Sequence, residues 1–158
     1  MENDFNAKVY AFINYLVDTK KYNNTTVLSA FKASSKLNEI YKNYYIWDFL
    51  PENCSGWVRE CYVKVGYFFA LHPKHSAKIN FAICIKKIKS GTIGKKFNNL
   101  LNADKDNIFE RTERMIRFAK SNNVAIDYVD LLWGLIKWNK DSKEVQNVWA
   151  EKFLVNFY

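Results

Sequence analysis

The sequence predicts an all-α fold, and three observations support this expectation. The 158 residues include only two prolines and five glycines, whereas all-β folds need many turns built from these residues. Apolar residues recur at helical spacing along most of the chain. Hydrophobic residues make up 49% of the chain and aromatic residues 17%, which is enough to form a buried core at this length. We therefore expect one or two small helical domains rather than a disordered chain.

Three helices are expected in the first half of the chain. The first covers residues 5–17, where aromatic and aliphatic side chains share one face. The second covers residues 26–46 and should end before Pro51, because a proline restricts the residue that precedes it. The third runs from about residue 56 to residue 71 and is stopped by the His-Pro pair at 72–73. Because this helix is apolar on most faces, we expect it to be central.

The segment 78–90 gives conflicting signals. Its apolar residues alternate as in a β-strand, and the helical pattern fits poorly. A single strand in a helical protein would leave both edges unpaired, so we expect a helix here. The alternating residues are Ile79, Phe81, Ile83 and Ile85.

A flexible joint follows at Gly91 and Gly94, where we place a domain boundary. The expected domains are an N-terminal bundle, residues 1–90, and a C-terminal bundle, residues 91–158. Four helices are expected in the second bundle, at about 95–102, 106–121, 128–138 and from 141 onward.

Two of these helices carry start signals. Asp127 is placed to cap the helix that begins at Tyr128. Asp141 with Glu144 resembles a capping box at the start of the last helix.

The formal net charge of +8 is concentrated in one segment. Between Cys61 and Ala103 the chain has eight lysines and no acidic residue, while basic and acidic residues balance elsewhere. Such a concentration of positive potential attracts polyanions. From charge alone, Lys86, Lys87 and Lys89 are therefore candidate contacts to nucleic acid.

An arginine stripe follows the lysine segment. Arg111, Arg114 and Arg117 are predicted to lie opposite the apolar face of the helix at 106–121, and each can form forked contacts to phosphate. The alternative is a solvated face on which Glu110 and Glu113 pair with the arginines. The long acid-free run favours polyanion binding, directed at the backbone and without sequence preference.

No catalytic or metal-binding motif is present, so we expect no enzymatic activity, no cofactor and no metal. His72 and His75 are the only histidines, and Pro73 breaks the helix that would align them. The chain has no nucleophile elbow, phosphate loop or carboxylate pair at motif spacing.

The three cysteines match no disulfide or zinc spacing, and we expect small buried residues at Cys54, Cys61 and Cys84. The tryptophans occupy apolar helical positions and are expected in the core: Trp47, Trp57, Trp133, Trp138 and Trp149. The acidic N-terminus and the absence of a long apolar stretch predict a cytoplasmic protein with no membrane partner.

Four segments, in the same order along the chain, resemble the motifs of one family. Residues 66–73 (GYFFALHP) are similar to A-x-L-F-A-x-H-P, and residues 94–104 (GKKFNNLLNAD) are similar to S-x-x-R/K-R-F-x-x-L-L-x-x-D. Residues 123–138 (NVAIDYVDLLWGLIKW) resemble G-x-x-I-D-W-x-x-L-L-x-D-L-x-x-W, and residues 145–150 (VQNVWA) resemble V-Q-x-x-W-A. The family is CasB, the small subunit of the type I-E CRISPR Cascade complex. Tyr128 replaces the usual tryptophan of the third motif.

The resemblance implies two small helical bundles joined by a linker, and a helix at 78–90. It also implies a role in antiviral defence without catalysis. The implied partners are other Cascade subunits, a second copy of the same chain, guide RNA, target DNA and the displaced DNA strand. In such complexes base pairing supplies sequence specificity, while the small subunit stabilises the R-loop along a basic surface.

The resemblance also implies contact residues. Lys95 and Lys96 match the family's basic pair, which is often arginine, and Lys32 matches an N-terminal arginine. Arg111, Arg114 and Arg117 fall in the family's basic helix.

Two other functions are weaker. The first is a generic basic module for an acidic partner or an anionic membrane surface. A membrane-binding helix should show a basic face opposite exposed apolar residues, and the lysine segment is not cleanly amphipathic in this way. A nuclease would need a cluster of carboxylates, and the basic segment contains none.

Overall fold

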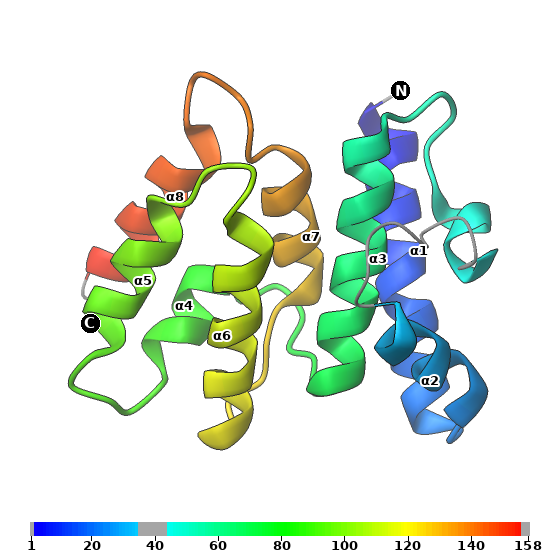
Figure 1. Ribbon diagram of the computed structural model, residues 1–158, viewed down its shortest axis with the longest axis horizontal. Coiled ribbons are helices and arrows are strands. Elements are labelled where there is room, and N and C mark those ends of the chain that lie inside the picture. Colours follow the sequence, from blue (N-terminus) through cyan, green and yellow to red (C-terminus); the bar gives the residue numbers. More distant parts are fainter. Residues whose placement is uncertain (1, 35–43, 156–158) are drawn as a thin grey trace. The chain divides into compact units, whose positions relative to one another are not determined.

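The computed structural model describes residues 2–34 and 44–155, and within them the chain is all-helical, as predicted (Figure 1). The chain divides into two compact units, Met1–Pro73 and Lys74–Tyr158. This division falls earlier than the boundary that the sequence suggested after residue 90. Residues 74–90 belong to the second unit, because the helix within them packs against later helices of that unit.

The first unit contains α1 (Glu2–Lys21), α2 (Thr25–Ala33), the 3-10 helix η2 (Tyr44–Phe49) and α3 (Gly56–Leu71). The expected first helix is confirmed, and α3 has the predicted limits. Ser55 caps α3 by accepting a hydrogen bond from the Val58 backbone N–H at 3.3 Å, which satisfies one of the helix's free donors.

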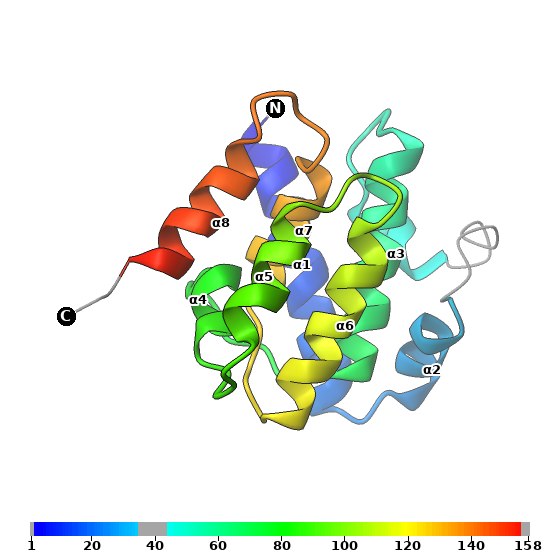
Figure 2. The ribbon, with the colours of Figure 1, turned by 60° about the vertical axis from the view of Figure 1, so that its left-hand side comes forward.

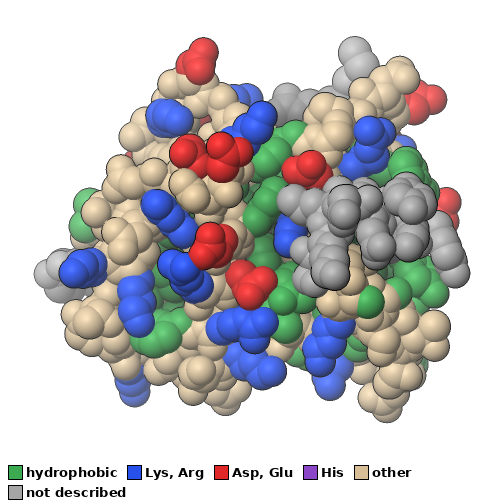
Figure 3. Space-filling view, viewed as in Figure 1, with side chains coloured by type: hydrophobic (Ala, Val, Ile, Leu, Met, Phe, Trp, Pro, Cys, Tyr) green, Lys and Arg blue, Asp and Glu red, His purple; other side chains and the backbone are tan. Residues whose placement is uncertain are grey.

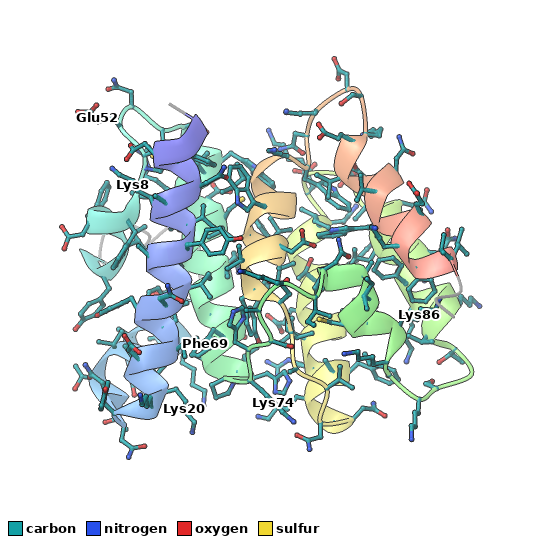
Figure 4. The ribbon with its side chains drawn as sticks, turned by 180° about the vertical axis from the view of Figure 1, so that it is seen from behind. Lys8, Lys20, Glu52, Phe69, Lys74 and Lys86 are labelled. Atoms are coloured by element: carbon teal, nitrogen blue, oxygen red, sulfur yellow. The ribbon has the colours of Figure 1, made fainter. Side chains whose placement is uncertain are left out.

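The single helix expected at 26–46 is wrong. Its first part is α2, which ends where the Ser34 backbone N–H returns to the Phe31 carbonyl. Its last residues lie in η2, and residues 35–43 lie outside the described part of the chain. Lys8 of α1 holds the segment after η2, since its Nζ donates to the Leu50 carbonyl at 3.0 Å (Figure 4).

Aromatic side chains form the core of this unit. The Phe12 ring lies 5.9 Å from the Phe31 ring and 5.0 Å from the Tyr62 ring, measured between centroids. Gly66 allows α2 to approach α3 closely, because a Cβ at this position would overlap the Phe31 ring.

The second unit contains five described helices. They are α4 (Phe81–Lys86), α5 (Ile93–Leu101), α6 (Ile108–Ser121), α7 (Tyr128–Ile136) and α8 (Glu144–Leu154). Helices α5 and α6 lie side by side, and α8 packs on α4 and α5 (Figure 2).

The segment 78–90 is helical only at α4, so the predicted helix is confirmed in part. Lys78 and Asn80 have positive φ values, 59° and 78°, which place a tight turn before the helix. The alternating pattern was misleading because Ile79 and Ile83 are only half-buried. The residues that α4 buries are Phe81, Ala82, Cys84 and Ile85, at helical spacing.

Asp127 caps α7 as predicted, and it also fixes the turn before α4. Its Oδ1 accepts from the Asp130 backbone N–H at 3.1 Å. Its Oδ2 accepts from the backbone N–H groups of Ile79 and Asn80, both at 3.0 Å. Asp130 continues the contact by accepting from the Phe81 N–H at 2.8 Å. Two carboxylates on one helix therefore satisfy the donors at the start of another.

The predicted capping box at the start of α8 is wrong. The helix begins at Glu144, and the residue before it, Lys143, adopts the left-handed conformation with φ 54° and makes no side-chain cap. Asp141 therefore lies outside the position from which a capping side chain could reach the first turn.

The expected burial of tryptophan and cysteine holds for part of each set. Trp138 and Trp149 are 1% and 2% exposed, but Trp57 and Trp133 are half-buried and Trp47 is 45% exposed. Cys61 and Cys84 are buried, whereas Cys54 is half-buried.

Candidate nucleic-acid interface

A groove with a cationic rim lies between α5 and α6. It encloses about 450 Å³. Both helices are strongly amphipathic, so their apolar sides pack inward and their polar sides border the groove. In Figure 3, basic side chains gather over these helices with acidic ones among them. The lining residues are Lys96 and Asn99 from α5, and Arg111, Arg114, Met115 and Phe118 from α6.

Arg111 is held in place across the groove. Its Nη1 donates to the Asn99 carbonyl at 2.6 Å, and the side chain is half-buried. A guanidinium carries five N–H donors in a fixed fork, so one hydrogen bond can orient the group while other donors serve an anion. Arg111 is thus a pre-positioned cation rather than a mobile one.

The other two arginines pair with glutamates of their own helix. Arg114 Nη2 lies 2.5 Å from Glu110 Oε1, and Arg117 Nε lies 3.2 Å from Glu113 Oε2. These are the pairs expected if the arginines only form a solvated face with Glu110 and Glu113. Because the Arg114 and Glu110 side chains are 73% and 65% exposed, water screens this pair, and such pairs contribute little to stability. A phosphate could replace Glu110 at small cost.

The predicted arginine stripe divides into two parts. Arg111 and Arg114 line the groove, whereas Arg117 lies outside its lining and faces Glu113. Successive residues on a helix are separated by about 100°. Arg117 is consequently turned further around α6 than the other two.

Lys96 completes the rim of the groove. Its Nζ lies 3.8 Å from the centroid of the Phe118 ring, and the side chain is exposed. Lys95, next to it on α5, is exposed as well. Of the basic pair Lys95–Lys96 that the family resemblance singled out, Lys96 therefore lines the groove with Arg111 and Arg114.

The remaining lysine candidates have different surroundings. Lys87 and Lys89 are exposed after α4. Lys86 is half-buried, and its Nζ donates to the Val155 carbonyl at 2.5 Å, beside the C-terminal end of α8 (Figure 4). Lys32 is exposed on α2, in the first unit.

Not every lysine of the acid-free segment is available to a ligand. Lys74 Nζ donates to the Asn123 backbone carbonyl at 3.1 Å and to its side-chain oxygen at 2.9 Å. This lysine ties the start of the second unit to the turn before α7. The acid-free run therefore predicted correctly that the surface is positively charged, but it overestimated how many of its lysines are available to a ligand.

Sequence reasoning missed Phe118 and Met115 as groove residues. Phe118 follows Arg114 by four residues and Arg111 by seven, which places the three on one helix face. An aromatic residue at this spacing among arginines was the available signal. Asn99 could not have been found this way, because it contributes through its backbone carbonyl.

Both histidines are part of the fold: His72 is buried at the end of α3, where its backbone N–H donates to the Phe68 and Phe69 carbonyls. His75 Nδ1 lies 3.1 Å from the Ile126 carbonyl oxygen and 3.2 Å from the Tyr128 backbone nitrogen. Burial lowers the pKa of His75 from its ordinary value, and the neighbouring Asp127 only partly offsets this effect.

Among the residues that the structure describes, no group of three or more His, Cys, Asp and Glu side chains is placed to hold a metal ion. No described helix is long and apolar enough to cross a membrane.

The fold and the groove define a small all-helical protein with a cationic surface groove. The family model for the CRISPR-associated protein Cse2 matches residues 28–154, which is most of the chain. The chain belongs to the Cse2 family of CRISPR-associated proteins, which includes the proteins called CasB.

Solved structures agree with this assignment. A CRISPR-associated protein of the Cse2 family from Thermus thermophilus is 25% identical, with a TM-score of 0.78 over 92% of this chain and 96% of that one. A structure of CasB from Thermus thermophilus is 24% identical, with a TM-score of 0.76 over the same shares. CasB from Thermobifida fusca is 13% identical, with a TM-score of 0.76 over 96% and 98%, a likeness of fold alone. A comparison with curated proteins found no significant match.

Proposed function

We propose that this chain is the non-catalytic small subunit of a type I-E Cascade complex and acts in the cytoplasm. It binds nucleic-acid backbone without sequence preference, and thereby stabilises the R-loop that guide RNA forms with target DNA, together with the displaced DNA strand. The observation that carries the proposal is the groove of Lys96, Arg111 and Arg114 in a chain of the Cse2 family.

The chemistry of the groove suits phosphate. Two guanidinium groups and one ammonium group border the same hollow, and arginine can offer a phosphate two parallel N–H donors. Contacts of this kind position a backbone but carry no sequence information. In an RNA-guided complex that role is sufficient, because base pairing selects the target.

Family membership supports the proposed partners. We propose that the chain associates with other Cascade subunits and with a second copy of itself. Guide RNA, target DNA and the displaced strand are its nucleic-acid partners. Lys32, Lys86, Lys87, Lys89 and Lys95 would extend the contact beyond the groove, as would Arg117.

A reconstitution experiment tests this function. Wild-type protein, added to a Cascade complex that lacks its small subunit, should restore tight binding of target DNA. The variant with Arg111, Arg114 and Arg117 all changed to Ala should restore it poorly while keeping its helix content. Substitutions outside the core usually cost little stability. Normal restoration by the triple variant would favour the solvated-face alternative.

A single variant with a charge-matched control sharpens the test. Glu110→Gln removes the carboxylate that now pairs with Arg114 and keeps the size of the side chain. This variant should bind single-stranded DNA more tightly than the wild type, because phosphate no longer competes with Glu110. Glu144→Gln is the matched control, because it removes another exposed carboxylate, 3.9 Å from Lys140 Nζ, and changes the net charge in the same direction. Glu144 lies on α8 and not in the groove lining, so this variant should have a much smaller effect.

The absence of catalysis is part of the proposal. Phosphodiester cleavage normally needs a metal held by carboxylates or histidines near the phosphate. The first carboxylates after the lysine segment are Asp104 and Asp106, and Asp104 Oδ1 accepts from the backbone N–H groups of Asp106 and Asn107. We expect no cleavage of DNA or RNA with magnesium or manganese. Metal-dependent cleavage that disappears in Asp104→Ala or Asp106→Ala would overturn this expectation.

A further inference from the structure

We infer that the α5–α6 groove binds one unpaired nucleobase of a single strand on the Phe118 ring, with its flanking phosphates on Lys96, Arg111 and Arg114. This inference rests on the proposed function and makes it more specific. It assigns the groove to single-stranded nucleic acid, and it gives a role to an aromatic residue that a purely electrostatic surface would not need.

The groove combines the two kinds of surface that a nucleotide presents. Its apolar part comes from Met115 and Phe118, and its cationic part comes from Lys96, Arg111 and Arg114. A volume of about 450 Å³ lies within the range of about 300–1,000 Å³ that is usual for small-molecule sites. Phosphates alone would use only the cationic part of the groove, whereas a nucleotide uses both parts.

The face of the Phe118 ring is accessible from the groove. Phe118 is half-buried, and Lys96 Nζ lies 3.8 Å from its ring centroid at the end of an exposed side chain. A ligand that displaces this ammonium group therefore reaches the ring face. An exposed cation–π contact is weak, whereas stacking of a base on an aromatic side chain is a principal source of single-strand affinity. A base can therefore replace the ammonium group, and Lys96 can move to a neighbouring phosphate.

The geometry of the arginines favours a nucleotide over an isolated phosphate. Arg111 is fixed by the Asn99 carbonyl at 2.6 Å, while Arg114 is held by its exposed pair with Glu110. Arg111 is thus fixed, whereas Arg114 can exchange its glutamate partner for a phosphate. Both border the apolar part of the groove, which Met115 and Phe118 form. Bases of a duplex are stacked and paired, so only an unpaired base can offer its face to Phe118.

The experiment measures fluorescence anisotropy with three DNA probes of equal length. They are an intact single strand, a single strand with abasic sites that keeps every phosphate, and a duplex. The wild type should bind the intact strand roughly 5- to 100-fold more tightly than the abasic strand, as expected for loss of base stacking. Phe118→Leu, which keeps the apolar bulk, should remove this preference, and Phe118→Tyr should retain it.

Two further variants separate charge from stacking. Arg114→Gln should weaken binding of the intact and abasic strands by the same factor, because both keep their phosphates and the ammonium group over the Phe118 ring belongs to Lys96. Tyr22→Leu is the control, since Tyr22 is 71% exposed and also has a lysine near its ring, with Lys21 Nζ 5.4 Å from the centroid. This control should leave all affinities unchanged.

The outcomes distinguish the inference from the function on which it rests. Equal binding of intact and abasic strands by the wild type would overturn the base site and leave the backbone function standing. The same holds if Phe118→Leu keeps the preference for the intact strand. Absence of binding to all three probes would overturn both. The comparison of the two single strands by the wild type needs no variant, so a folding defect cannot obscure it.

Discussion

Trp149 connects three helices of the second unit through packing and one hydrogen bond. Its ring lies 4.8 Å from Phe81 and 5.6 Å from Trp138, and its Nε1 donates to Asp130 Oδ2 at 3.0 Å. Gly134 makes room for it, because a Cβ there would overlap the indole. Burial raises the pKa of Asp130, and the hydrogen bonds from Phe81 and Trp149 partly offset this effect.

Replacing Trp149 should therefore cost far more stability than replacing Trp133. Trp149→Ala removes a side chain that is 2% exposed, and the free energy of unfolding should fall by about 3–5 kcal/mol. Trp133 is half-buried, with Lys137 Nζ 4.6 Å from its ring centroid, so Trp133→Ala should cost less. Chemical denaturation of both variants measures the difference. Equal losses would show that exposure does not govern the cost here.

His75 should make stability depend on pH. Its pKa in the folded protein is lowered by burial from the ordinary value of 6.5, so the unfolded chain binds a proton more readily than the folded one. The contribution of neutral His75 is therefore present above pH 6.5 and is lost as the pH falls below it.

Denaturation from about pH 7.5 to about pH 5.5 tests this prediction. The wild type should lose more stability over this range than His75→Asn, whose side chain can occupy the position of Nδ1 but does not titrate. His72 is present in both proteins and cancels. Parallel curves for the two proteins would exclude His75 as the source.

At the scale of secondary-structure elements, α4 depends on a helix distant in sequence. It has six residues, too few for a helix to be stable alone. The N–H groups of the preceding turn bind Asp127, and the first N–H of α4 binds Asp130. The helix is thus held from α7, which explains why local pattern predicted it poorly.

Asp127→Ala should destabilise the protein by at least about 3 kcal/mol, because it removes the cap of α7 and leaves two further N–H groups without their acceptor. Asp127 is 3% exposed, so water cannot easily replace the carboxylate. Hydrogen exchange should accelerate at the Ile79, Asn80 and Asp130 amides. As a control, Asp141→Ala changes a carboxylate that caps no helix and should have little effect. Unchanged exchange at Ile79 and Asn80 would contradict the proposed link.

At the scale of the whole molecule, the proposed function makes the net charge of +8 the main determinant of association with nucleic acid. The phosphate contacts that we propose lie in the α5–α6 groove, at Lys96, Arg111 and Arg114. Binding by backbone charge releases counterions, so its affinity must depend on salt.

The affinity of the pure protein for single-stranded DNA should fall with salt. If about four to six phosphates are neutralised, the slope of log affinity against log salt should be about −3 to −4. The triple arginine variant should show a shallower slope, because it neutralises fewer phosphates. Titrations at several salt concentrations, with two unrelated sequences, measure both effects. An affinity independent of salt, or a strong preference for one sequence, would contradict the prediction.

Several features of this protein followed from the sequence alone. Helical spacing with few glycines and prolines determined the all-α class. The end of α3 followed from His72 and Pro73, and the cap of α7 followed from Asp127. The family followed from four ordered motifs. Spacing and capping depend on neighbouring residues, and the motifs are read directly along the chain, so none of these features requires knowledge of tertiary contacts.

Other features were decided only by the tertiary structure. The position of α4 in the second unit depends on Asp127 and Asp130, more than forty residues away in sequence. The charge pattern predicted a positively charged surface. It could not show that Lys74 donates hydrogen bonds to Asn123 or that Arg117 lies outside the groove lining. The groove exists because α5 packs on α6, which brings Lys96 over Phe118 and Asn99 to Arg111. Contacts between residues distant in the chain arise from packing, and a linear pattern does not contain them.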